Sequence, residues 1–85
     1  MQYKFLSPVQ KVNGEKLEEV DLKESFTGRD VRAIGNAGGE GSATIALVSA
    51  ATGLSENTVL GMDARDVAII ANMAKPFLVG GGVSG

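Results

Sequence analysis

The chain has 85 residues, a net charge of −2, no cysteine and no histidine. This length suits one small domain, and the missing residue types exclude disulfides, thiolate chemistry and the commonest general base and metal ligand. The slightly acidic balance gives no electrostatic reason to bind nucleic acid, and the first residues lack the basic and apolar regions of a signal peptide. We therefore expect a single domain over residues 1–79 that acts in the cytoplasm, not in a membrane, and needs no cofactor or metal.

Residues 3–24 predict a β-hairpin that turns at Asn13 and Gly14, the strongest short-range turn signal in the chain. A two-residue turn there fixes the register, which pairs Phe5 with Leu22. Alternation along the strands then places five apolar side chains on one face: Tyr3, Phe5, Val9, Val20 and Leu22. We expect this face to cover the rest of the domain.

Two details of the hairpin qualify that register. It places Lys4 opposite Lys23, and like charges directly opposite each other are unfavourable. Pro8 has no N–H to donate, so its strand should lie at an edge or carry a bulge. An open edge could accept a strand from a partner, although a simple covering ribbon is the plainer interpretation.

Helical spacing and terminal residues predict four short helices, at 28–35, 43–52, 55–60 and 64–75. Thr27 and Asp63 are suited to cap the first and last of them, where Asp66 adds favourable negative charge to the first turn. Gly53 is suited to end the second helix, and Pro76 to end or kink the last. Together with the hairpin they predict an α+β fold, a small helical layer on a ribbon, with a flexible glycine-rich tail at 80–85.

The helix at 43–52 is apolar on most of its circumference and carries no charge, so something must cover it nearly all round. We expect Val31, Ile34 and Leu60 of the neighbouring helices to face inward with it. The last helix has one apolar face and, beside it, a second apolar strip that includes Ile69 and Met73.

The sequence offers no recognisable reactive centre. The glycine-rich stretch 35–42 precedes a helix but has neither a phosphate-binding signature nor a lysine, and Glu40 would repel phosphate. No serine or threonine has a histidine to activate it, so we expect no enzyme. Residues 43–60 superficially resemble a helix-turn-helix, but the second helix is short and acidic, which disfavours DNA binding.

The order of these parts resembles the short phage tail assembly chaperones of contractile-tailed phages and prophages. The resemblance is carried by the junction from Leu22-Lys23-Glu24 through Thr27 to Asp30-Val31-Arg32, by Ile45-Ala46-Leu47 through Ala51-Thr52-Gly53-Leu54-Ser55, and by Met62-Asp63-Ala64-Arg65-Asp66-Val67. The family often has a proline after the glutamate of the junction, where this chain has Ser25. The glycine-rich middle and tail also depart from a typical member.

The resemblance implies a non-enzymatic factor that binds the helical tape measure protein during tail morphogenesis, in the host cytoplasm and outside the mature virion. It also implies a longer frameshifted form of the chain and the tail tube protein as further partners. For the client we expect an apolar surface on the last helix, because its bulky side chains exceed what one small core needs: Ile69, Met73, Phe77 and Leu78. These four could instead pack on the hairpin. The alternative functions are a small self-associating structural or adaptor subunit and, less favoured, a DNA-binding protein.

Overall fold

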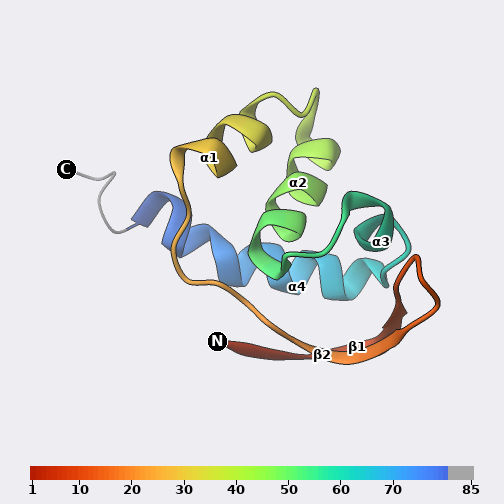
Figure 1. Cartoon of the computed structure of the whole chain (residues 1–85). Coiled ribbons are helices and arrows are strands. Elements are labelled where there is room, and N and C mark those ends of the chain that lie inside the picture. The colour runs from red at the N-terminus through yellow and green to blue at the C-terminus, as the bar shows by residue number, and fades with distance from the viewer. Residues whose placement is uncertain (81–85) are drawn as a thin grey trace.

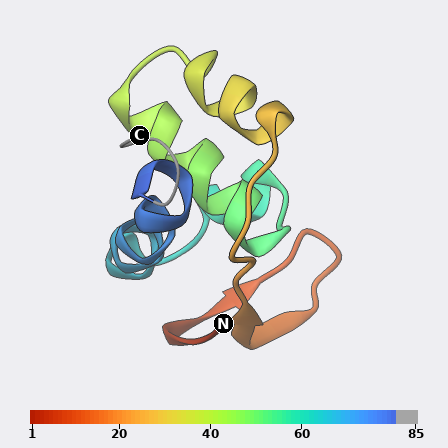
Figure 2. The same cartoon turned by 90° about the vertical axis from the view of Figure 1, so that its left-hand side faces the viewer.

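The computed structural model describes residues 1–80, which form a β-hairpin followed by a layer of helices (Figure 1). The elements in chain order are β1 (Gln2–Gln10), β2 (Lys16–Asp21), α1 (Gly28–Gly35), α2 (Glu40–Thr52), α3 (Glu56–Leu60), α4 (Ala64–Lys75) and a π-helical turn, η1 (Pro76–Gly80). The helices lie on one side of the hairpin, and α4 crosses between the hairpin and α2 (Figures 1 and 2). The predicted α+β class is confirmed, whereas residues 81–85 of the predicted tail lie outside the described residues.

Local caps explain why α1 and α4 begin where they do. The Thr27 hydroxyl accepts the Asp30 N–H at 3.3 Å, and the Asp30 carboxylate accepts the Thr27 N–H at 3.0 Å, so each residue satisfies a free amide of the other. Asp63 caps α4 by accepting the Arg65 N–H at 2.8 Å. These two helices have the bounds that their sequence predicts.

The second helix starts earlier than predicted. It begins at Glu40, where residue 43 was expected, because Ser42 and its neighbours continue the helix and the Ala43 N–H donates to the Gly39 carbonyl at 2.8 Å. The backbone turns into the helix at Gly39, whose φ is +139°, and leaves it at Gly53, whose φ is +77°. Both values lie in the region that favours glycine.

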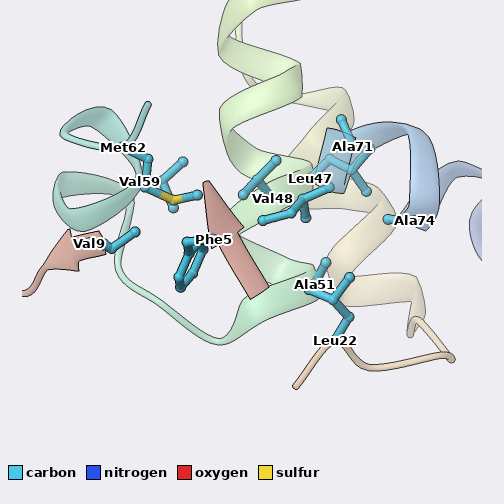
Figure 3. Packing of buried hydrophobic residues seen from close by; sticks show 11 residues of the cluster. Phe5, Val9, Leu22, Leu47, Val48, Ala51, Val59, Met62, Ala71 and Ala74 are labelled. Carbon is cyan, nitrogen blue, oxygen red and sulfur yellow. The ribbon is translucent and has the colours of Figure 1, made fainter. Parts of the chain in front are cut away.

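A single apolar cluster joins the hairpin to α2, α3 and α4 (Figure 3). Its members come from β1 and the chain just after β2, from the three helices, and from the connection before α4: Phe5, Val9, Leu22, Leu47, Val48, Ala51, Val59, Met62, Ile70, Ala71 and Ala74. Val48 and Ile70 are wholly buried. The apolar face predicted for the hairpin is confirmed, since Phe5, Val9 and Leu22 are buried in this cluster.

Two predictions about inward-facing residues are wrong. Val31 of α1 is 52 % exposed and Leu60 of α3 is 65 % exposed. Helix α1 lies at the outside of the layer. Of its side chains, Ile34 packs against the buried apolar cluster. Helix α3 is a short helix that turns Val59 inward, and this leaves Leu60 on the solvent side.

The predicted hairpin register is also wrong. Tyr3 pairs with Val20 and Lys4 with Glu19, whereas beyond a register shift Val9 pairs with Leu17. The residues of β1 between Lys4 and Val9 therefore form a bulge that includes Pro8, as the missing N–H of proline predicts.

Two local features accompany the observed register. Lys4 meets an acidic residue, Glu19, where the predicted pairing would have placed a lysine opposite it. At the hairpin turn only Gly14 has a positive φ, and the Asn13 side chain accepts the Glu15 N–H at 2.9 Å, so the loop is wider than a two-residue turn.

Candidate functional site

One buried carboxylate ties the bulge of β1 to the first turn of α4. Asp66 has no solvent exposure, and its Oδ1 accepts the Tyr3 hydroxyl at 2.6 Å and the Leu6 N–H at 2.8 Å. Its Oδ2 accepts the Ser7 N–H at 3.2 Å. The amides of Leu6 and Ser7 lie where the register of β1 shifts, so Asp66 supplies the acceptors for the bulged strand.

Asp66 is the structural residue that sequence reasoning misinterpreted, since it was expected only to add favourable negative charge to the first turn of the last helix. Its position carried a usable signal. Asp66, Ile70 and Ala74 are spaced i, i+4 and i+8, so the carboxylate lies on the same face of α4 as core residues. A carboxylate on such a face requires partners, and the bulge at Pro8 provides them.

The single tyrosine of the chain reports on this contact. Burial, and then the hydrogen bond to Asp66, raise the pKa of Tyr3 to about 12. An unfolded tyrosine ionises near pH 10, so the stabilisation from Tyr3 should be complete below about pH 10 and be lost as the pH rises through about 12.

We expect an absorbance titration of the phenolate to give a pKa of about 12 in the folded protein. Asp66→Asn should lower the pKa of Tyr3, because it removes the anion that disfavours a second negative charge. Circular dichroism at each pH would show that the chain is still folded. A wild-type tyrosine that titrates at its ordinary value would contradict the observed contact.

A second contact joins the same two elements at the surface. The Ser7 hydroxyl donates to Asp63 Oδ2 at 3.1 Å, and the Arg65 guanidinium donates to the same carboxylate at 2.9 Å. These contacts, with the Arg65 N–H, hold the pKa of Asp63 well below its usual range. Asp63 and Asp66 thus have structural partners, and within residues 1–80 no three histidine, cysteine, aspartate or glutamate residues are grouped so that they could hold a metal ion.

The four residues predicted to bind a client occupy two different sides of the C-terminal segment. Ile69 and Phe77 are 37 % and 39 % exposed, and Met73 between them is half-buried and packs against the core. Ile69 and Met73 are spaced i and i+4 on α4, and Phe77 follows four residues later in η1; we call these three residues the outer row. Leu78 is also half-buried, but it lines a groove between α1, α2 and η1 that contains no residue of the outer row.

The outer row lies on a helix at the edge of the molecule. Figure 2 shows α4 at one side of the layer, with α2 above it and the hairpin below. The separation of Leu78 follows from helical geometry, because Leu78 comes one residue after Phe77 and consecutive residues of a helical turn point to different sides. Across residues 1–80, no helix combines the length and the apolar character that crossing a bilayer requires.

The outer row is apolar and partly exposed, and hydrogen bonds between β1 and the start of α4 hold its helix in place. Such a surface suits protein binding. The chain matches the family model described as phage tail assembly chaperone proteins, E, or 41 or 14, over residues 2–79. Neither the search of curated proteins nor that of solved structures found a match. Because the family model covers nearly the whole sequence, the chain belongs to the phage tail assembly chaperone family.

Proposed function

We propose that this chain is a non-enzymatic chaperone that binds the tape measure protein while a phage or prophage tail is assembled. The observation that carries the proposal is the outer row, in which Ile69 and Phe77 remain exposed on a helix of a chaperone-family protein. A tape measure protein is a long helical client, and an amphipathic helix is recognised through apolar anchors spaced by three or four residues. Ile69, Met73 and Phe77 have the same spacing.

The composition of the outer row suits a repetitive client. Isoleucine and phenylalanine give it bulk, and methionine at the centre adapts its shape to different partner side chains. Within this proposal the chaperone acts in the host cytoplasm and is absent from the mature virion. The tail tube protein and a frameshifted longer form of the chain are its further partners.

The test is co-expression with the tape measure protein encoded in the same gene cluster, followed by affinity capture of the tagged client. Ile69→Glu should abolish co-purification, because it places a charge in the outer row. Met73→Glu should do the same, although Met73 also packs against the core and this variant must be checked for folding. Ile69→Glu is the cleaner variant, since its side chain is more than a third exposed.

Ala68→Glu is the matched control, because it adds the same charge to an exposed position of α4 outside the outer row. It should leave capture unchanged. Helical circular dichroism should be equal for the wild type, Ile69→Glu and Ala68→Glu. Undiminished capture by folded Ile69→Glu would refute the outer row as the client site.

A further inference from the structure

The two edges of the hairpin differ in what covers them. At the edge of β1, the N–H groups of Leu6 and Ser7 donate to Asp66, so the start of α4 closes that edge. The sheet has only the strands β1 and β2, and within residues 1–80 no helix forms a hydrogen bond with β2. The far edge of β2 is therefore open, at the lower end of the molecule in Figure 2.

The register shows which backbone groups face this open edge. Just beyond the strands, the Leu22 N–H donates to the Met1 carbonyl at 2.6 Å, and the Met1 amino group donates to the Leu22 carbonyl at 3.1 Å. Hydrogen-bonded pairs alternate with non-hydrogen-bonded pairs along an antiparallel ladder. Asp21 and Glu19, one and three positions before Leu22, therefore lie in non-hydrogen-bonded pairs. Their N–H and C=O groups point away from β1, into the open edge.

The side chains of β2 indicate what kind of strand would fit beside it. On the inner face, Leu17 and Val20 pack against the core but are only partly buried, so a third strand would cover them further. On the other face, Glu19 and Asp21 are exposed. The six residues of β2 include three acids and one base, so the strand is net negative. This charge disfavours a second copy of β2 at the edge and favours a basic segment.

We propose that the open edge of β2 binds an extended basic segment of a partner protein, which adds a third strand to the sheet. The segment alternates apolar residues with lysine or arginine, because successive side chains of a strand fall on opposite faces. Its apolar side chains lie beside Leu17 and Val20, and its basic side chains lie beside Glu19 and Asp21. This surface goes beyond the proposed function, since the outer row belongs to α4 and η1.

Amide hydrogen exchange of the purified chain, measured by NMR with and without a peptide, tests the proposal. The probe is a synthetic peptide of about ten residues that alternates valine and lysine. At saturation, exchange at the Glu19 and Asp21 amides should slow by about tenfold or more, because they become donors to the peptide. The Val20 amide should change less, since it already faces β1 in a hydrogen-bonded pair.

Two changes to the peptide separate strand addition from attraction between charges. Glutamate in place of lysine should weaken binding by about tenfold or more, because it reverses the charge. N-methylation of every second residue, on the lysines in one peptide and on the valines in another, keeps the charge and removes alternate donors. One of these two peptides should bind at least about tenfold more weakly, since only alternate N–H groups of a strand face its neighbour.

Variants of the chain locate the site. Glu19→Lys should weaken peptide binding by about threefold or more, and Glu19→Gln replaces it if the new charge opposite Lys4 unfolds the hairpin. Glu56→Lys is the matched control, because it makes the same change at an exposed position of α3, and it should bind the peptide as the wild type does. Ile69→Glu should also bind normally, which separates this result from a failure of client binding.

Three results would overturn the proposal. The first is unchanged exchange at Glu19 and Asp21 at the highest peptide concentration. The second is equal binding of the unmodified peptide and both N-methylated peptides, which would mean that charge alone holds the peptide. The third is exchange at these two amides that slows as the chain alone is concentrated, which would mean that a second copy occupies the edge.

Discussion

Asp66→Ala should lower the free energy of unfolding by about 3 to 5 kcal/mol, because it removes the acceptor of three donors at a fully buried position. A chain of this length has a total stability of about 4 to 13 kcal/mol, so the variant should be partly unfolded or close to it. Two of the orphaned donors are backbone amides, at Leu6 and Ser7, and they cannot turn to water without undoing the bulge. Urea denaturation followed by circular dichroism measures the effect.

Asp63→Asn is the matched control for this variant. It removes a carboxylate three positions earlier at the surface, retains a good helix cap and weakens an exposed ion pair with Arg65. Asp63→Asn should lower the free energy of unfolding by less than about 1 kcal/mol. Equal costs for the two variants would show that Asp66 is not the principal link between the hairpin and α4.

Ile70→Ala should lower the free energy of unfolding by about 2 to 5 kcal/mol, which is the range for truncating a wholly buried isoleucine. Ile70 lies in the cluster that the hairpin, α2, α3 and α4 share, so the cavity would open at their common contact. The surroundings are braced from several directions and cannot collapse freely into it.

The neighbouring residue provides the control, since Ile69→Ala makes the same chemical change where the side chain is 37 % exposed. We expect it to cost less than about 1 kcal/mol. The denaturant midpoints of the two variants give the difference in their free energies of unfolding, provided that this free energy falls with denaturant concentration at the same slope in both. A larger cost at Ile69 than at Ile70 would mean that α4 is rotated from its observed orientation.

The sequence predicted those parts of the fold that local chemistry determines. Thr27 and Asp63 define helix starts through their own side chains, and Pro76 ends α4 because it lacks an N–H, so α1 and α4 have the predicted bounds. The buried face of the hairpin also follows from alternation alone. Each of these features depends on residues close together in the chain.

The hairpin register could not be predicted in this way, because it depends on a residue about sixty positions away. Turn chemistry at Asn13 and Gly14 favours a regular ladder, but the amides of Leu6 and Ser7 instead find acceptors on Asp66. The exposure of Val31 has a similar cause, since helical spacing shows which residues share a face but not which helices lie outermost.

The candidate site was partly predictable for the same reason. Helical spacing places Ile69 and Met73 on one strip, and the structure leaves Ile69 and Phe77 exposed. Leu78 was grouped with them because it follows directly in the apolar sequence. Because consecutive residues of a helical turn point to different sides, Leu78 lies instead in the groove beside α1 and α2.

The central claim is that the outer row of α4 and η1 receives the helical client. Methyl-resolved NMR of the labelled chain, titrated with helical segments of the tape measure protein, tests it most directly. The account predicts that the Ile69 and Met73 methyl signals shift most on binding, with little change at Ile45 near α3 and at the buried Ile70. Binding that leaves Ile69 and Met73 unshifted, or no binding of any segment, would contradict it.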